Sequence, residues 1–147
     1  MREIDVHLCG RRLYEEMLYW ETAEQREGEI GEPEREFAAI WRELPKIVFS
    51  SALDHVEGNA TLAADDVAGE VARLKREPAR GDIAIGGARL AARAIELSLI
   101  DEYRPFVNPV VLGGGTPFLG RGARLQLELL ETRTFGSRVV YLRYRRL

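Results

Sequence analysis

Cysteine is nearly absent from this chain of 147 residues, in which Cys9 is the only one. A single thiol excludes an intramolecular disulfide and a metal site built from several cysteines. The two histidines, His7 and His55, do not have the spacing of zinc ligands either. We therefore expect no metal site, and a protein of a reducing compartment, the cytoplasm.

The chain also lacks a strong excess of charge and a long apolar run. Its 21 Lys and Arg residues nearly balance 24 Asp and Glu residues, and the net charge is −3 at pH 7. This balance argues against a protein built to neutralise nucleic-acid phosphates. The apolar runs are far shorter than the ~20 residues that span a bilayer, and residues 1–10 do not form a signal peptide. We expect neither nucleic acid nor a membrane as a partner.

What is present is an alternation of strand-like and helix-like segments in a chain of one-domain length, 1–147. Apolar patterning predicts strands at 4–9, 46–50, 59–64 and 82–87. Helical spacing predicts helices at 11–20 and 88–97. A helix from Pro33 to Leu44 would have Phe37, Ile40 and Trp41 on one face. Another would follow the cap Asp65, with Val67, Val71 and Leu74 inward.

The last third contains strand-like runs without helices between them, at 102–112, 124–135 and 138–145. Leucines alternate in the second run, and Val140, Leu142 and Tyr144 alternate in the third, which is the period of a strand. We predict that these two runs pair antiparallel. Helix-linked strands followed by a β-rich end predict a three-layer αβα fold with a mixed sheet.

Three of the predicted strands end in residues that suit a phosphate. Gly10 precedes Arg11 and Arg12, Ser50 and Ser51 follow the second strand, and Gly86 and Gly87 open the last helix. Each has an ordinary structural explanation, since glycines form tight turns, arginines face solvent and serines close turns. In parallel α/β sheets, however, ligands gather at the carboxyl ends of the strands. Together, the three ends favour a bound nucleotide.

The segments "CGRRLYEEM", "IVFSS", "IAIGGARLA", "DEYRPFVNPVVLGGGTPFL" and "LLETRTF" occur in an order that resembles the dihydrofolate-reductase-like superfamily. Within it, the chain is most similar to the C-terminal reductase domain of the riboflavin-biosynthesis deaminase-reductase. The resemblance implies a mixed sheet that binds NADPH across strand ends. It also implies these cofactor-binding residues: Gly10, Arg11, Arg12, Leu13, Ser50, Ser51, Gly86, Gly87, Ala88, Arg89 and Leu90.

The chain departs from the family pattern at three places. Leu13 stands where the family usually has Thr, and Ser51 stands where many relatives have Arg or Lys, which bears on the preference for NADPH over NADH. The first thirty to forty residues of the pattern, with its first strand, have no counterpart before Gly10. No matched position supplies a catalytic carboxylate, so no catalytic residue is assigned. On this basis we expect cofactor binding to survive better than turnover.

The resemblance therefore implies an NADPH-dependent reductase of the riboflavin-biosynthesis type, or of a related small substrate, that acts by hydride transfer. The alternative is a non-catalytic nucleotide-binding or dimeric scaffold protein that has lost the N-terminal part of the active site. We also expect a homodimer, because family members commonly pair and exposed apolar surface usually marks an interface.

Overall fold

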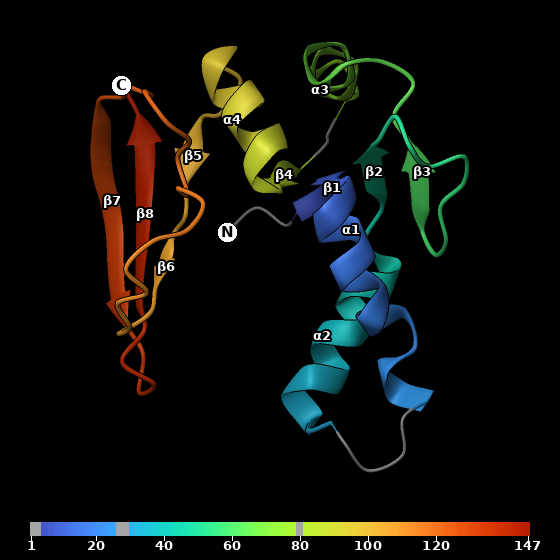
Figure 1. Cartoon of the computed structure of the whole chain (residues 1–147), viewed down its shortest axis with the longest axis horizontal. Helices are drawn as coiled ribbons and strands as arrows, with labels where there is room; N and C mark the ends of the chain where they lie inside the picture. The colour runs from blue at the N-terminus through green and yellow to red at the C-terminus, as the bar shows by residue number, and fades with distance from the viewer. Residues whose placement is uncertain (1–3, 26–29, 79–80) are drawn as a thin grey trace. The chain divides into compact units, whose positions relative to one another are not determined.

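A computed structural model describes residues 4–25, 30–78 and 81–147 of the chain (Figure 1). The strands are β1 (Ile4–Gly10), β2 (Lys46–Phe49), β3 (Ala60–Leu62), β4 (Asp82–Gly86), β5 (Glu102–Tyr103), β6 (Phe106–Val107), β7 (Leu127–Thr134) and β8 (Val140–Arg146). The helices are α1 (Arg11–Met17), α2 (Glu32–Glu43), α3 (Val67–Lys75) and α4 (Ala88–Glu96), with the short 3₁₀ helices η1 (Leu18–Glu21) and η2 (Ala23–Gln25) after α1. The predicted α/β class is confirmed.

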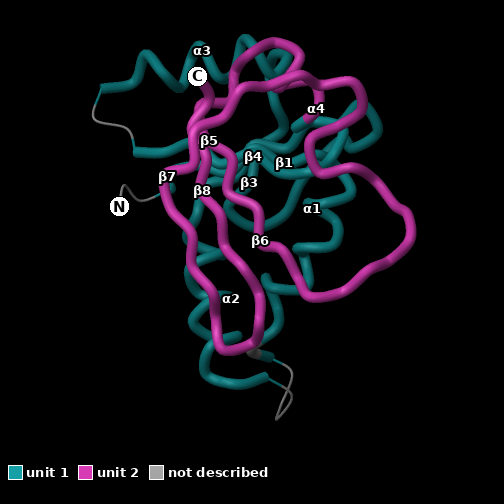
Figure 2. Tube along the Cα trace, turned by 90° about the vertical axis from the view of Figure 1, so that its left-hand side faces the viewer, with its two compact units in different colours: residues 1–91 teal, residues 92–147 magenta. Residues whose placement is uncertain are grey.

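The chain forms two compact units, residues 1–91 and 92–147, and the boundary in sequence falls within α4 (Figure 2). Unit 1 contains a parallel sheet with the strand order β3-β2-β1-β4. Unit 2 contains an antiparallel sheet built around β8. The parallel and the antiparallel strands expected from the sequence are thus both present, in two separate sheets.

The core of unit 1 lies on both faces of its sheet, because successive side chains of a strand point to opposite faces. On one face, Val6 and Leu8 of β1 are buried together with the predicted inward residues of α3, Val67, Val71 and Leu74. On the other face, Cys9, Tyr14, Trp41 and Val48 form a buried cluster. Figure 2 shows α3 and α1 on opposite sides of these strands.

Two details of the predicted helices were wrong. Phe37 and Ile40 of α2 stay 41% and 59% exposed, because Phe37 packs edge-on against Trp20 and stacks on Trp41, and of these three α2 residues only Trp41 reaches the core. Asp66, rather than Asp65, caps α3, since its carboxylate accepts a hydrogen bond from the N–H of Gly69 (2.8 Å). The Asp65 carboxylate accepts from the N–H of Asp66 instead (2.8 Å).

In unit 2, β7 and β8 pair antiparallel from Leu127–Arg146 to Thr134–Val140, which confirms the predicted pair. The expected strand at 102–112 is wrong in extent: only β5 and β6 form, two residues each, on the other side of β8. Pro105 lies between them and has no N–H to donate, although its carbonyl still accepts from Leu142 (3.1 Å). Beyond β6, Val111 and Leu112 are 95% and 82% exposed.

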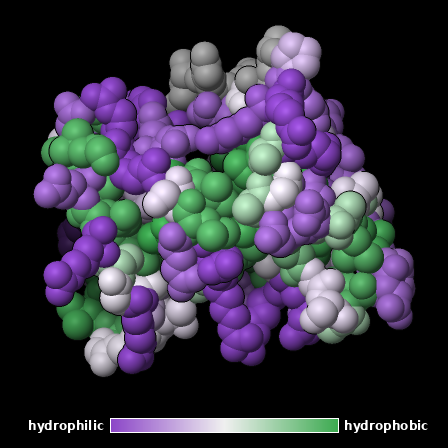
Figure 3. Space-filling model, turned by 90° about the horizontal axis from the view of Figure 1, so that it is seen from above, coloured by the Kyte–Doolittle hydropathy of each residue, from purple (hydrophilic) through white to green (hydrophobic). Residues whose placement is uncertain are grey.

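A carboxylate joins two arginines on one face of this antiparallel sheet. Glu102 accepts hydrogen bonds from Arg143 (2.7 and 2.9 Å) and from Arg104 (2.7 and 3.0 Å). These hydrogen bonds, those from Arg143 first, lower the pKa of Glu102 from 4.5 to about 2. Figure 3 shows such hydrophilic residues interspersed with apolar side chains at the molecular surface.

Among the described residues, none of the helices has the length and apolar character needed to cross a bilayer.

Candidate functional site

The three predicted phosphate-binding segments lie side by side at one edge of the parallel sheet. β1 is flanked by β2 and β4, and Gly10 is aligned with Phe49 while Cys9 is aligned with Gly86. The three strands are parallel, so their carboxyl ends point the same way. We call this row of strand ends, with Gly10–Leu13, Ser50–Ser51 and Gly86–Leu90, the carboxyl edge.

The backbones of Gly10 and Gly87 are in close contact across this edge. A Cβ atom on Gly87 would lie 3.3 Å from the backbone N and 3.4 Å from the Cα of Gly10. Gly87 also has a φ of +95°, a conformation that residues with a side chain rarely adopt. Glycine is therefore required here by the approach of β1, whatever else binds nearby.

Gly86 differs from Gly87 in that side chains, rather than backbone, pack over it at the end of β4. A Cβ atom there would collide with a methyl group of Leu13 and lie 2.9 Å from Cε1 of His7. Leu13, which lacks the hydroxyl of the family pattern, thus packs over the strand end. This contact leaves the backbone of α4, rather than the space above Gly86, to meet a ligand.

The N-terminus of α4 fits an anion. Its first helical hydrogen bond runs from Ala91 N–H to the Gly87 carbonyl (2.9 Å), so Ala88, Arg89 and Leu90 donate to no carbonyl of the helix. The first turn of this nine-residue helix contains no acidic residue, and Ala88 and Arg89 are exposed. Backbone donors, the helix dipole and an arginine in one turn suit a phosphate group.

The arginines after Gly10 are also exposed. Arg11 pairs with Glu15 one turn along α1, with 3.1 Å between Nη1 and Oε1. Exposed pairs of this kind stabilise a helix by only ~0.3–0.5 kcal/mol, so a dianionic ligand can displace the carboxylate. Arg12 is exposed at the same end of the helix. Both guanidinium groups are suited to bidentate contacts with a phosphate.

Ser50 serves the protein's own backbone. Its hydroxyl oxygen accepts hydrogen bonds from the N–H groups of Ala52 (3.1 Å) and Leu53 (3.2 Å) and so closes the turn after β2. The hydroxyl proton is left to donate to a ligand or water. Ser51 is exposed beside it. The structure thus brings all three predicted segments to one edge and gives several of their residues a structural role as well.

Sequence reasoning missed a contact beneath this edge, between the half-buried His7 and the fully buried Cys9. His7 Nδ1 lies 3.1 Å from Cys9 Sγ, and the imidazole packs edge-on against Trp41 with a centroid distance of 5.5 Å. Burial lowers the pKa of His7, and burial raises the pKa of Cys9 from 9.0 to about 11. The pair is therefore neutral at pH 7. His7 and Cys9 are two residues apart in a predicted strand, which puts their side chains on the same face. This spacing was the signal available in the sequence.

A buried lysine was also missed, because nothing in the sequence marks it. Lys46 begins β2, and its side chain is 1% exposed. Its ammonium group donates to the carbonyl of Trp41 (2.5 Å) and pairs with Glu21 (3.2 Å). It lies 4.8 Å from the centre of the Trp41 ring. The contacts link η1, α2 and β2.

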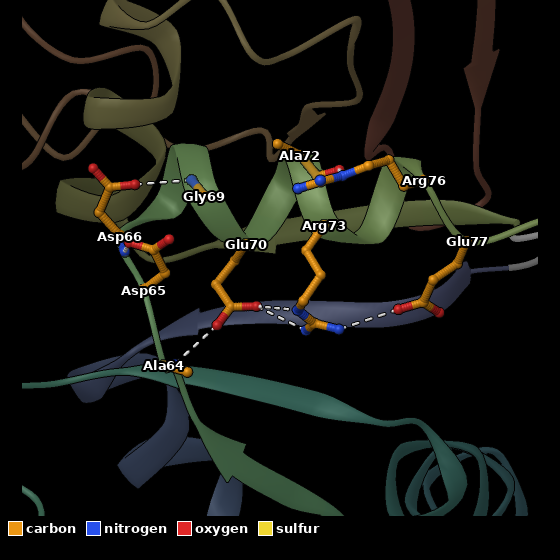
Figure 4. Close-up of polar contacts among 9 residues, drawn as sticks. All are labelled: Ala64, Asp65, Asp66, Gly69, Glu70, Ala72, Arg73, Arg76 and Glu77. Atoms are coloured by element: carbon orange, nitrogen blue, oxygen red, sulfur yellow. Dashed lines mark hydrogen bonds and ion pairs between the residues drawn. The ribbon is translucent and has the colours of Figure 1, made fainter.

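A pocket of about 470 Å³ opens at the opposite edge of unit 1, where the strands begin. Asp5, Thr61, Arg73 and Glu77 are among its lining residues. Its arginine is already neutralised: Arg73 lies between Glu70 (2.7 Å) and Glu77 (3.1 Å) on α3 (Figure 4). The Asp5 carboxylate accepts from the N–H of Gly81. Asp5, Arg73 and Glu77 thus already have partners within the protein, which makes the carboxyl edge the better candidate.

The sequence pattern of one protein family covers nearly all of the chain. The family described as RibD C-terminal domain matches residues 1–141, across both units. The uncharacterized protein YyaP of Bacillus subtilis (strain 168) is 33% identical over 145 residues, which are 98% of this chain and 75% of YyaP. The chain therefore belongs to the RibD C-terminal domain family, as the resemblance of its motifs predicted.

Solved structures agree on the fold. A protein from Shewanella sp. PV-4 named for riboflavin biosynthesis aligns with a TM-score of 0.73 and 19% identity, over 99% of this chain and 75% of its own. A diaminohydroxyphosphoribosylaminopyrimidine deaminase/5-amino-6-(5-phosphoribosylamino)uracil reductase from Thermotoga maritima aligns with a TM-score of 0.61 and 12% identity. This alignment covers 98% of the chain but only 46% of the Thermotoga protein.

Proposed function

We propose that this protein is an NADPH-dependent reductase of the riboflavin-biosynthesis type, acting on a small substrate by hydride transfer. The observation that carries the proposal is the carboxyl edge, where Gly10 and Gly87 touch and the α4 N-terminus opens beside them. Membership of the RibD C-terminal domain family supports it. The Thermotoga protein, named as a uracil-derivative reductase, suggests the substrate class to try first.

The residues of the carboxyl edge fit the cofactor by their chemistry. The N–H groups of Ala88, Arg89 and Leu90 and the guanidinium of Arg89 would hold the pyrophosphate. Arg11 would meet the 2′-phosphate, with Arg12 and Leu13 in the same turn, and Ser50 and Ser51 would face the adenosine. The bound nicotinamide supplies the hydride, while the protein supplies orientation and electrostatics.

The decisive experiment measures NADPH binding first and turnover second. Calorimetric titration of the full chain is expected to give a Kd on the order of 1 μM or weaker, about −8 kcal/mol. Loss of NADPH absorbance is then followed with 5-amino-6-(5-phosphoribosylamino)uracil as the substrate. NADPH binding together with NADPH oxidation in the presence of this substrate would support the reductase. An absence of NADPH binding at millimolar concentrations would overturn the proposal.

The Arg11→Ala variant tests the assignment of the 2′-phosphate. Only NADPH carries this group, so the substitution should weaken NADPH about tenfold, which is the loss of one charge-assisted contact, and leave NADH nearly unchanged. Arg93→Ala is the matched control, because Arg93 forms the same kind of exposed helical pair, with Glu96 (3.1 Å), and belongs to none of the three segments of the carboxyl edge. Equal losses for NADPH and NADH would remove Arg11 from this role.

The second candidate is a nucleotide-binding protein without catalysis. The observation in its favour is the neutral state of His7 and Cys9, the titratable pair next to Gly86. At pH 7 the Cys9 thiol is therefore not a thiolate nucleophile, and the neutral His7 is not a cationic general acid. NADPH binding at the expected affinity with no oxidation, for the uracil derivative and for simple carbonyl compounds, would favour this candidate over the reductase.

A further inference from the structure

The helix α2 leaves one of its faces to solvent. It extends beyond the parallel sheet of unit 1 (Figure 1) and packs chiefly against the 3₁₀ helices η1 and η2. Its buried residues are Ala38 and Trp41, whereas Phe37 and Ile40 are exposed. Single exposed apolar residues are ordinary, but neighbouring ones on an otherwise charged helix mark a surface that binds a partner.

The exposed apolar residues of α2 have the spacing of a helix–helix seam. Pro33, Phe37 and Ile40 are four and three residues apart, as the a and d positions of a heptad are. Trp20 of η1 widens this row, because it packs edge-on against Phe37 with 4.9 Å between the ring centroids. Aromatic side chains of this kind are common anchors of an interface. The face therefore suits a second helix that lies along α2.

A row of carboxylates follows one side of this seam. Glu32, Glu36 and Glu43 are four and seven residues apart, so they lie on one face of the helix, beside the apolar row. All three are exposed, and within the described part of the chain none of them forms an ion pair. With Phe37 at an a position, Glu36 and Glu43 occupy g positions, whose charges select the partner of a helix pair.

We propose that this face of α2 binds a basic amphipathic helix of another protein, which packs its apolar residues on Phe37 and Ile40. The lysines or arginines of that helix lie opposite Glu36 and Glu43. Unpaired carboxylates beside an apolar seam attract a cationic helix and repel an acidic one, so the charge determines which helix binds. The surface is separate from the carboxyl edge and needs no nucleotide.

The same charges argue against a second copy of this chain on this face. In an antiparallel pair of α2 helices the g positions face each other, so glutamate would lie opposite glutamate. In a parallel pair the g positions face the e positions, which hold Glu34 and Trp41 and supply no cation. The helix as a whole contains four glutamates and two arginines. The cations must therefore come from a different sequence.

Peptide binding tests the proposal. The probe is a synthetic helical peptide with leucine at its a and d positions and lysine at its e and g positions, whose charges keep it from pairing with itself. Its counterpart has glutamate at e and g. Fluorescence anisotropy of each labelled peptide, titrated with the full chain, measures the dissociation constants. The lysine peptide should bind at least about tenfold more tightly than the glutamate peptide.

Charge reversal should reverse this preference. The double variant Glu36→Lys/Glu43→Lys should bind the glutamate peptide about tenfold more tightly than the lysine peptide. Ile40→Ser should weaken the lysine peptide about tenfold without a change of charge, which attraction between charges alone does not predict. Glu16→Lys/Glu57→Lys is the matched control, since both glutamates are exposed in unit 1 but lie outside α2. This control should keep the preference of the unmodified chain.

Equal affinity for the two peptides, or no binding of either, would overturn the proposal. So would a double variant Glu36→Lys/Glu43→Lys that still prefers the lysine peptide. Circular dichroism checks the folding of each variant, and if the double variant unfolds, an unchanged affinity of Ile40→Ser for the lysine peptide is equally contrary. Sedimentation of the chain alone covers the remaining occupant: a dimer that Ile40→Ser abolishes would put a second copy on this face. None of these measurements depends on NADPH, so they leave the proposed reductase untouched.

Discussion

At the scale of single residues, burial decides what the titratable groups of unit 1 can do. Cys9 is fully buried between its sheet neighbours, and His7 is the partner that its thiol meets at 3.1 Å. Desolvation favours the neutral form of both groups, raising the pKa of the thiol and lowering that of the imidazole. A Cys–His contact here therefore stabilises packing rather than activating a nucleophile.

We predict that Cys9 reacts slowly with thiol reagents in the folded protein. The rise of its pKa from 9.0 to about 11 reduces the thiolate fraction at pH 7 by about a hundredfold, before steric protection is counted. Reaction with an aromatic disulfide reagent, followed by absorbance, measures the rate. The same protein in guanidinium chloride serves as the control and should react at the rate of a free thiol. Rapid labelling without denaturant would contradict the burial of Cys9.

The glycines of the carboxyl edge mark the limit of sequence reasoning at this scale. The pattern put Gly86 and Gly87 where a strand leads into the last helix, and in the structure other groups closely approach both glycines. The approaching groups come from Gly10, His7 and Leu13, on a strand and a helix far away in the chain. Only the sheet register brings them together, and register depends on tertiary pairing rather than on local sequence.

At the scale of elements, helical periodicity correctly predicted the buried residues of a helix that packs one face against the sheet. Val67, Val71 and Leu74 of α3 are all buried, as their spacing indicated. The same reasoning failed for Phe37 and Ile40 of α2, because that helix packs through Trp41 and aromatic neighbours instead of along its whole apolar face. Spacing identifies an apolar stripe but does not reveal the breadth of the surface that covers it.

The cap of α3 gives a matched pair of variants. Asp66→Ala removes the acceptor for the N–H of Gly69 and should lower the free energy of unfolding by about 1 kcal/mol. Asp65→Ala removes a bond to the neighbouring N–H of Asp66 at an exposed position and should cost less. Urea denaturation of both variants compares the losses. A larger loss for Asp65→Ala would restore Asp65 as the cap.

At the scale of the whole molecule, the fold class and the candidate edge were predictable for the same reason. Strands separated by helices indicate parallel pairing, and parallel pairing puts the segments that follow Cys9, Phe49 and Ile85 at one edge. The division at residues 91 and 92 was not predictable, because α4 is one continuous helix in sequence and in structure. Which strands pair with one another in each sheet depends on tertiary contacts rather than on local sequence.

Acid stability is the whole-molecule property that the charge network of Glu102 predicts. The pKa of Glu102 falls from 4.5 in the unfolded chain to about 2 in the folded one, so the folded state binds fewer protons between these values. The stabilisation is fully present above pH 4.5 and is lost as the pH falls towards 2. Glu102→Gln removes it at pH 7 and should make the free energy of unfolding less dependent on pH below 4.5.

Denaturant titrations at a series of pH values, read by tryptophan fluorescence and by circular dichroism, test this expectation. Both tryptophans, Trp20 and Trp41, lie in unit 1, whereas Glu102 lies in unit 2. Circular dichroism therefore reports the loss in unit 2 directly, whereas the fluorescence reports the unfolding of unit 1. Glu96→Gln, which breaks an exposed pair in the same unit, should remain within ~0.5 kcal/mol of the unmodified protein. The difference in free energy of unfolding between Glu102→Gln and the unmodified chain should shrink as the pH falls from 4.5. A difference that stays constant would assign the acid stability to other carboxylates.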